Sequence, residues 1–514
     1  MKFSVKVFSK KDKKGKQPLE MSGTITVETQ KSTKQGVRTR FAPSPTGFMH
    51  VGNVRSAIYP WLFALQHGGE FVLRIEDTDK VREVEGAIGH IMETLKWLGI
   101  KWNESIDVGG PYGPYIQSER LPLYRAYAQK LLAAGHAYPD PYTEEELEAL
   151  RARAEEEKRP FLFRDHRPEE IDEWNGTAPL RFRVPEIKRY AWHDLIMGDL
   201  SAGEEALDDF IMIKGDGYPT YNFAHIVDDI EMKITHVMRG QEYVSSTPKY
   251  LAVYEALGIQ PPVYATLPHI LASGGGKKLS KRDGAKDLLE YRAEGYLPEA
   301  MLNFIALLGW HPSGDEEVLS REDLLREFDI SRVQRSGAQF DEQKLLHLNR
   351  EWMRKLSSEE YVERGNLTEV PGIDQERLPA IVPLLKERAH TFAEARTMLA
   401  GELSCLFTAP SPLRETLVSK EVQMAQGSTK GHLEAILGLV EGLHEGMAAE
   451  SIKAEIMPYA DSIPKEAGGR GAVLWPLRYA LSGAERSPDP FTLISLLGKE
   501  ESISRIRTAL GILG

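Results

Sequence analysis

Segments with two different hydrophobic repeats follow one another in the N-terminal part of the chain. A period of two is typical of strands, and apolar residues at three- and four-residue spacing indicate helices. The patterns predict strand, helix, strand and helix in turn over residues 37–42, 53–66, 70–79 and 88–98. Pro43 should end the first strand, and Pro60 should kink or shorten the first helix.

The order of these elements predicts a parallel sheet, because strand, helix and strand in sequence form the right-handed crossover unit of such sheets. Strand patterns return at residues 234–240 and 263–271, and a glycine-rich segment follows at 273–285. We therefore predict an α/β doubly wound, Rossmann-like parallel sheet, built from residues 37–115 and 226–290.

Residues 116–225 separate the two parts of this sheet and carry a mixed pattern, so they are predicted to form an α+β insertion. Within them, the run TEEELEALRARAEEEK at 143–158 predicts a solvent-exposed helix. Beyond about residue 290, apolar stripes at helical spacing follow one another with no convincing strand. The pattern predicts a multidomain protein with an all-α C-terminal region.

Composition narrows the class of protein. The chain has 514 residues, 41% of them hydrophobic, which suits several packed units. Its net charge of −12 means that a nucleic-acid partner would need local basic surface. A single cysteine, Cys405, excludes an internal disulfide and a multi-cysteine zinc cage, and favours a reducing compartment. No apolar run approaches the roughly 20 residues that cross a bilayer, which excludes an integral membrane protein.

Residues 1–36 carry nine lysines against three acids and no arginine. They lack the apolar segment and small-residue cleavage site of a secretory signal, and an ordinary transit peptide is rich in arginine. We interpret them as a basic N-terminal extension, either a mobile tail or a source of additional RNA affinity.

Three charged residues stand where predicted strands end. Arg40 ends the first strand, Glu76 the second and Arg239 a later one. Each of them alone is an ordinary surface charge. However, ligands of open parallel sheets bind beyond the carboxyl ends of the strands, which is where these three residues are predicted to lie.

Two glycine-containing segments indicate phosphate binding. Gly47, His50 and Gly52 precede the first helix, whose N-terminal amides and partial positive charge favour an anion. Lys277–Arg282 follows three glycines, and lysines on such a loop can follow polyphosphate charge as it builds up. A structural histidine and an ordinary basic loop would look similar, so it is the conjunction of the two segments that indicates a nucleotide site.

Longer strings carry a family resemblance. HVGN at His50–Asn53 resembles the His-Ile-Gly-His signature of class I aminoacyl-tRNA synthetases, and KLSKR at Lys278–Arg282 resembles their Lys-Met-Ser-Lys-Ser signature. From about residue 37 to the end, the chain is similar to the bacterial-type glutamyl-tRNA synthetases. The strings that match are RFAPSPTG, RIEDTD, GYPTYNFA, VDD, THVMRG, LLGW, WPLRYALSG and LLGKE.

The resemblance implies a two-step reaction. L-Glutamate attacks the α-phosphorus of ATP, which Mg²⁺ accompanies, and the glutamyl group of the adenylate then passes to the terminal ribose of tRNA-Glu. It also implies that tRNA binds before the amino acid is activated, and that the protein is a cytoplasmic monomer with no membrane partner. The implied tRNA contacts are the acceptor end at 116–225, the stem at 291–357 and the anticodon at 358–514.

The resemblance assigns roles to individual residues. Catalytic roles fall to His50, Lys278 and Lys281. The residues implied to bind ATP are Thr46, Gly47, His50, Gly52, Glu242, Lys278, Ser280 and Lys281. Those implied to bind glutamate are Arg40, Ala42, Ser44, Glu76, Tyr221 and Arg239. Two guanidinium groups suit a substrate with an additional carboxylate, and Glu76 suits its ammonium group.

Three departures from the family pattern stand out. His225 replaces the asparagine or aliphatic residue of many relatives, and Gln241 replaces a common acid. The string AYPDPY at Ala137–Tyr142 lacks the cysteines with which some relatives hold zinc, so no structural zinc and no protein-held metal are predicted.

Other functions stay open at this point. A glutaminyl-type synthetase is disfavoured by PSPTG, and a truncated paralogue that loads glutamate onto a modified base is disfavoured by the long helical C-terminal region. A catalytically silent tRNA-binding paralogue is disfavoured by the intact signature residues. The choice between tRNA-Glu alone and tRNA-Gln in addition is not decided by the sequence.

Overall fold

The computed structural model of the chain describes residues 36–169, 173–272, 274–279, 286–418 and 428–514. The extension expected over residues 1–36 lies outside this part of the chain, except for Gly36. Val37–Gly514 form one unit of contacts. No helix in the described ranges is both long and apolar enough to span a bilayer.

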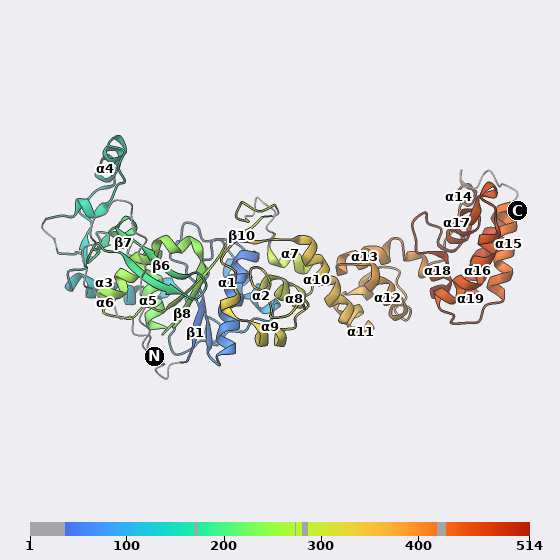
Figure 1. Cartoon of the computed structure of the whole chain (residues 1–514), viewed down its shortest axis with the longest axis horizontal. Helices are drawn as coiled ribbons and strands as arrows, with labels where there is room; N and C mark the ends of the chain where they lie inside the picture. Colours follow the sequence, from blue (N-terminus) through green and yellow to red (C-terminus); the bar gives the residue numbers. More distant parts are fainter. Residues whose placement is uncertain (1–35, 170–172, 273, 280–285, 419–427) are drawn as a thin grey trace, which may run out of the picture. The chain divides into compact units, whose positions relative to one another are not determined.

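The predicted strand–helix–strand unit is present near the N-terminus (Figure 1). β1 (Arg38–Phe41) and β2 (Glu70–Leu73) pair in parallel and are connected through α1 (Val51–Gln66). α2 (Ala87–Trp97) follows β2. All four residues of β1 are buried, as expected for a parallel strand that is covered on both faces.

α1 starts earlier than predicted and ends at the predicted residue. It begins at Val51, two residues before the expected start, because His50 caps it. Pro60 does not end the helix, which continues to Gln66. Trp61 and its apolar neighbours are fully buried, and tertiary packing of this kind outweighs the missing proline N–H.

The second part of the sheet contains β8 (His236–Gly240) and β9 (Val263–Leu267), which pair in parallel. The amide of Thr235, just before β8, donates to the carbonyl of Arg38 over 2.9 Å, so β8 lies beside β1. The two segments that the sequence assigned to one sheet are therefore neighbours.

The sheet is mixed rather than wholly parallel, which corrects the prediction. β5 (Tyr190–Asp194) and β6 (Gly198–Ala202) form an antiparallel hairpin, and β5 pairs in parallel with β9 at Asp194 and Tyr264. The hairpin comes from the region expected to be a separate insertion. It continues this sheet because β5 pairs with β6 on one side and with β9 on the other.

The rest of that region has its own antiparallel sheet of β3 (Ala137–Pro139), β4 (Leu180–Phe182) and β7 (Phe210–Ile213). Its charged run forms α4 (Glu144–Glu156), which Thr143 caps and in which only Ala154 is buried. The exposed helix predicted here is confirmed. The other helices of this part of the chain are α3 (Leu121–Ala133), α5 (Tyr221–Glu231) and α6 (Thr247–Leu257).

The C-terminal region is helical, as predicted. Its helices are α7 (Leu288–Ala293), α8 (Pro298–Ala306), α9 (Arg321–Glu327), α10 (Glu342–Lys355), α11 (Ser358–Arg364), α12 (Leu378–Arg388), α13 (Phe392–Ala400), α14 (Arg414–Leu417), α15 (Ser428–Glu441), α16 (Ala449–Ser462), α17 (Gly469–Ser482), α18 (Pro490–Leu497) and α19 (Lys499–Leu513).

One strand interrupts this helical region. β11 (Ala338–Gln339) pairs in parallel with β10 (Ile270–Leu271), so the expectation of no strand after residue 290 is wrong at this position. A strand of two residues is too short to show any alternation, and only its partner reveals it.

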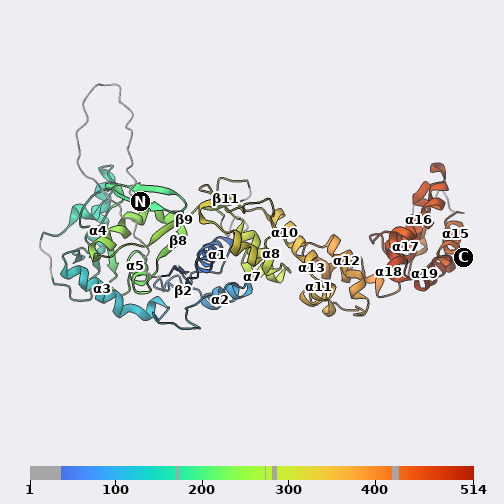
Figure 2. The same ribbon diagram turned by 60° about the horizontal axis from the view of Figure 1, so that its bottom comes forward.

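A shared hydrophobic core links the sheet to the first C-terminal helices. α8 packs against α1, and α10 packs against α8 (Figure 2). Buried Ile58 and Trp61 of α1 belong to the same cluster as Phe304 of α8 and Leu348 of α10. Residues well beyond 290 thus support the helix that His50 begins.

Candidate active site

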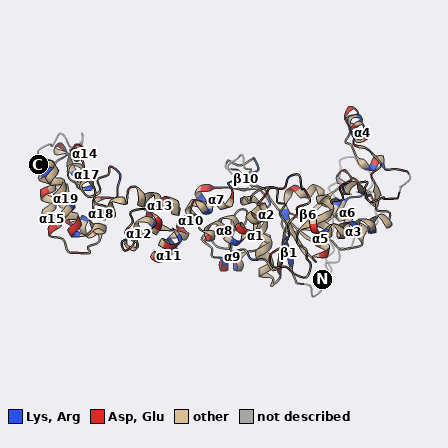
Figure 3. Ribbon diagram, turned by 180° about the vertical axis from the view of Figure 1, so that it is seen from behind, with Lys and Arg blue, Asp and Glu red and all other residues tan. Residues whose placement is uncertain are grey.

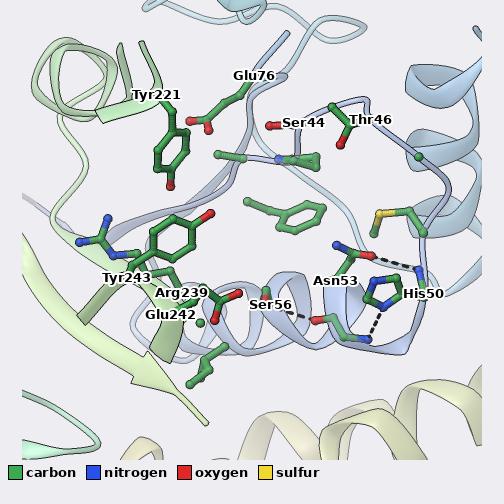
Figure 4. A pocket seen from close by; sticks show the side chains of 18 of the residues that line it. Ser44, Thr46, His50, Asn53, Ser56, Glu76, Tyr221, Arg239, Glu242 and Tyr243 are labelled. Carbon is green, nitrogen blue, oxygen red and sulfur yellow. Dashed lines mark hydrogen bonds between the residues drawn. The ribbon is translucent and has the colours of Figure 1, made fainter. Parts of the chain in front are cut away.

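A cleft of about 1020 Å³ opens at the carboxyl ends of β1 and β8 (Figure 4). Every predicted site residue that the structure describes lines it: Arg40, Ala42, Ser44, Thr46, Gly47, His50, Gly52, Glu76, Tyr221, Arg239, Glu242 and Lys278. Ser280 and Lys281 lie outside the described residues. The volume is large enough for a nucleotide together with a small second ligand.

His50 forms the N-terminal cap of α1. Its Nδ1 accepts a hydrogen bond from the amide of Gly52 over 3.1 Å, and its own amide donates to Oδ1 of Asn53 over 3.2 Å. A neutral ring that accepts at Nδ1 carries its proton at Nε2, which is a donor suited to a phosphate. Gly52 is required here, because a Cβ at this position would lie 2.9 Å from Cε1 of His50.

The described part of the lysine-bearing loop folds back on β10. The amide of Ala272 donates to the carbonyl of Lys277, and the amide of Leu279 donates to that of Ile270. The three glycines between them all have positive φ, from 71° to 99°, a backbone that residues with a Cβ rarely adopt. From the sequence, these glycines are interpreted as giving mobility to the loop. Their positive φ angles show that the backbone conformation also favours glycine.

Lys278 lines the same cleft as His50 and pairs with Glu242. Its Nζ is 3.1 Å from Oε1 of Glu242. Burial raises the pKa of Glu242, but its backbone hydrogen bond and Lys278 lower that pKa overall, so the carboxylate is charged. A polyphosphate entering the cleft would compete with Glu242 for this lysine.

Arg40 and Glu76 are held by a buried ion network. Nε and Nη2 of Arg40 donate to the two oxygens of Asp229 over 3.2 and 3.4 Å. Arg74 donates to Asp229 and to Glu76, each over 2.9 Å. Burial raises the pKa of Asp229, but Arg40 and Arg74 outweigh it and lower that pKa to about 2.

Arg239 contacts aromatic rings, unlike Arg40 and Arg74, which contact carboxylates. Its guanidinium lies over the rings of Tyr250, Tyr264 and Tyr243, 4.6 to 5.4 Å from their centroids. It is only 7% exposed, yet no carboxylate among the described residues lies within 4 Å of it. Because a buried charge without a counter-ion is costly, this position favours an anionic ligand.

His225 contacts both Arg239 and Tyr221. Its Nδ1 donates to the carbonyl of Tyr221 over 2.7 Å, which leaves Nε2 to accept from Nη1 of Arg239 over 3.4 Å. Its ring also stacks on that of Tyr221, with centroids 4.8 Å apart. His225 is not among the residues that line the cleft, so this departure from the family pattern acts on two predicted site residues rather than on the ligand.

The burial of His225 predicts sensitivity to acid. Burial and Arg239 lower its pKa from 6.5 to about 3, so the unfolded chain binds a proton first. The contribution of neutral His225 to the free energy of unfolding is complete above about pH 6.5. Between there and about pH 3, each unit of acidification should lower the free energy of unfolding by up to about 1.4 kcal/mol. Urea unfolding at about pH 7.5 and about pH 4.5 measures this slope. In His225→Asn, where nothing titrates at this position, the slope should be smaller, and an equal slope would contradict the assignment.

Comparisons with known proteins decide the family. The chain matches "tRNA synthetases class I (E and Q), catalytic domain" over residues 36–347 and "Anticodon binding domain" over 344–510. The glutamate–tRNA ligase of Clostridium botulinum is 41% identical over 483 residues, which is 92% of this chain and 98% of that protein. That of Anaeromyxobacter sp. is 39% identical over 482 residues, covering 93% and 99% of the two chains.

The chain belongs to the class I tRNA synthetases for glutamate and glutamine. Solved structures agree with this. A crystal structure of a glutamate–tRNA ligase from Elizabethkingia meningosepticum, in complex with its amino acid, is 36% identical and superposes with a TM-score of 0.81, covering 93% of this synthetase and all of that chain. A glutamate–tRNA synthetase structure from Elizabethkingia anophelis has the same identity and a TM-score of 0.78.

The cleft of this synthetase is cationic although the chain is acidic. Lysines, arginines, aspartates and glutamates are spread over all parts of the described chain (Figure 3). Among the described residues that line the cleft, seven are basic and three are acidic. The basic ones are Arg40, Arg55, Arg82, Lys214, Arg239, Lys277 and Lys278. Local charge, not net charge, therefore fits the site to anionic substrates.

Sequence reasoning missed several residues of the synthetase site. Tyr243 stacks on Tyr221 with ring centroids 5.3 Å apart, and the two rings lie together in Figure 4. Arg55 is buried beneath the cleft and donates to the carbonyls of Leu308 and Pro268. Arg55 could have been found from the sequence, since it is a charged residue within the apolar pattern of α1. No sequence feature indicated Tyr243.

No group of three metal-ligating side chains comes together in the part of the synthetase that the structure describes. The absence of a structural zinc stays a prediction. ATP is a substrate of this family.

Proposed function

We propose that this chain is a glutamate–tRNA ligase. It joins L-glutamate to AMP with release of pyrophosphate, and transfers the glutamyl group to the 3′-terminal ribose of tRNA-Glu. The observation that carries the proposal is Arg239, a buried guanidinium without a carboxylate partner among the described residues, in the same cleft as Arg40. Glutamine, with a neutral amide, would leave that charge uncompensated.

Glutamate is held by groups from β1, α5 and β8 and from the segments that follow β1 and β2. Arg40, Tyr221 and Arg239 bind its side-chain carboxylate, Glu76 binds its ammonium group, and Ala42 and Ser44 line the space between. Burial raises the pKa of Glu76, and Arg74 opposes that effect. An ammonium group beside Glu76 adds a second positive charge and so favours its ionised form. Charge complementarity at both ends of the substrate supports this orientation.

ATP occupies the other side of the cleft. Thr46, Gly47, His50 and Gly52 hold the phosphates against the start of α1, and Glu242 lies near the ribose. A glutamate carboxylate oxygen attacks the α-phosphorus, and the bond to the pyrophosphate oxygen breaks. The residues that stabilise the pyrophosphate are Lys278, Ser280 and Lys281. Mg²⁺ bound together with ATP would neutralise phosphate charge; no residue of this chain is assigned to it.

The remaining parts of the chain bind tRNA. Residues 116–225 contact the acceptor end, 291–357 the stem and 358–514 the anticodon. The match to an anticodon-binding family over 344–510 supports the last of these. We place the enzyme in the cytoplasm as a monomer that requires tRNA for amino-acid activation.

Exchange of labelled pyrophosphate into ATP tests the function. With L-glutamate and tRNA-Glu, exchange should proceed; without tRNA it should fall to background. L-Glutamine should support little exchange, since its amide cannot neutralise Arg239. Exchange with glutamine alone would reverse the specificity assignment, and no exchange under any condition would favour the silent tRNA-binding paralogue.

A further inference from the structure

His90 joins the segment before α1, which lines the cleft, to the start of α7, and does not itself line the cleft. Its Nε2 is 2.8 and 2.7 Å from the two carboxylate oxygens of Asp287. Its Nδ1 accepts a hydrogen bond from the amide of Met49 over 3.4 Å. The ring of Phe48 stacks on it, with centroids 4.6 Å apart and planes 26° from parallel. His90 is on α2, which carries none of the predicted site residues.

The two segments that His90 joins are next to catalytic positions in the sequence. Met49 immediately precedes His50, the cap of α1. Asp287 caps α7 by accepting from the amide of Leu289 over 2.9 Å, and it follows the lysine-bearing loop. The amide of Leu288 also donates to the carbonyl of Met49 over 3.0 Å. The amide of Met49 thus bonds to His90, and its carbonyl bonds to the start of α7.

The tautomer follows from these bonds. Because a backbone amide donates to Nδ1, the proton of the neutral ring is on Nε2, where it is donated to Asp287. Each nitrogen therefore has a fixed and different partner. The side chains of His90 and Asp287 are 11% and 18% exposed, so solvent competes little for this pair.

We propose that His90 is a positioning residue, which holds the His50 segment and the chain that follows the lysine-bearing loop in one arrangement. The inference rests on the proposed function, in which the His50 segment and the lysine-bearing loop act on the phosphates of ATP. Its loss should lower kcat of tRNA-dependent exchange by about 10- to 100-fold, since displacements of about 1 Å have effects of this size. KM for glutamate should stay nearly unchanged, because Arg40 and Arg239 lie on β1 and β8.

The test compares four variants of the full chain. His90→Ala removes both bonds. His90→Asn keeps an acceptor near Nδ1, and His90→Gln keeps a donor near Nε2, so each should restore part of kcat. Asp287→Ser keeps a helix cap but removes the carboxylate. Combined with His90→Ala, it should lower kcat no further than His90→Ala alone, because that change already removes the contact with Asp287.

A second histidine–aspartate pair supplies the control. His193 on β5 is 2.8 Å from Asp199 on β6, and this exposed pair does not line the cleft. His193→Ala should leave kcat unchanged. If His90→Ala lowered only the free energy of unfolding, or if its effect multiplied with that of Asp287→Ser, the positioning role would be overturned.

Hydrogen–deuterium exchange separates this inference from the proposed function. In His90→Ala, amides of peptides spanning residues 47–53 and 286–292 should both exchange faster than in the unsubstituted protein and in His193→Ala. This result holds whether or not the protein catalyses pyrophosphate exchange. Acceleration in one peptide without the other would show that His90 does not join the two segments.

Discussion

Replacing Arg239 with glutamine should reduce kcat/KM for glutamate by about 30- to 4,000-fold, with little change in KM for ATP. Removing one partner of a buried, hydrogen-bonded charge pair costs about 2–5 kcal/mol, which corresponds to that range. The substrate carboxylate would be left in the cleft facing only Arg40, whose charge is already shared with Asp229. Steady-state exchange kinetics with varied glutamate and ATP measure both constants.

Two further variants sharpen this experiment. Arg239→Lys keeps the charge but loses the planar fork, so it should recover only part of the activity. Arg321 also lies over an aromatic ring, 5.0 Å from the centroid of Trp61, but outside the cleft. Arg321→Gln should therefore leave kcat/KM near the unsubstituted value. Equal losses in Arg239→Gln and Arg321→Gln, or a matching rise in KM for ATP, would show that Arg239 does not bind the glutamate side chain.

The sequence predicts the cleft well because its determinants are local. Arg40 and Arg239 lie near the carboxyl ends of β1 and β8, Glu76 comes soon after β2, and parallel strands bring such ends to one edge. His50 is recognised from its own neighbours, the glycines and the apolar pattern of α1. The structure gathers these residues although they are up to about two hundred positions apart in the chain.

The residues that the sequence does not predict depend on distant partners. Arg74 and Asp229 lie in the noticed strings RIEDTD and VDD, but nothing local shows that they pair with each other across the core. His225 was an unexplained departure until its two nitrogens could be assigned to Tyr221 and Arg239. Likewise, the β5–β6 hairpin and the two-residue β11 are defined by the strands beside them, not by their own patterns.

Hydrogen bonding and ion pairing around the cleft explain why Arg239 is available to a substrate, since Arg55, which also lines the cleft, donates to the carbonyls of Leu308 and Pro268. Three buried arginines and three buried carboxylates contact one another beneath the cleft, so their charges balance: Arg40, Arg74, Arg120, Glu76, Asp228 and Asp229. Arg239 is outside this balanced set. The same network thus holds Arg40 and Glu76 and leaves the charge of Arg239 unneutralised, which is what an additional substrate carboxylate requires.

Asp229→Ala should lower the free energy of unfolding by about 3–5 kcal/mol, the usual result of removing one partner from a buried ion pair. Arg40 and Arg74 would lose their shared carboxylate and remain buried, at 5% and 0% exposure, with an excess of positive charge. Asp229→Asn should lose nearly as much, because one oxygen becomes an N–H donor that faces guanidinium donors. Urea unfolding followed by tryptophan fluorescence at neutral pH measures these changes.

The matched control for Asp229 is Asp199, whose side chain is 94% exposed and pairs with His193. Asp199→Ala should change the free energy of unfolding by less than about 0.5 kcal/mol, as surface pairs contribute little. The double variant Asp229→Ala with Arg40→Met removes a charge of each sign, so it should be more stable than Asp229→Ala alone while having little activity toward glutamate. If the double variant were less stable by the sum of two separate losses, Arg40 and Asp229 would not act as a pair, and the charge balance that leaves Arg239 available would not hold.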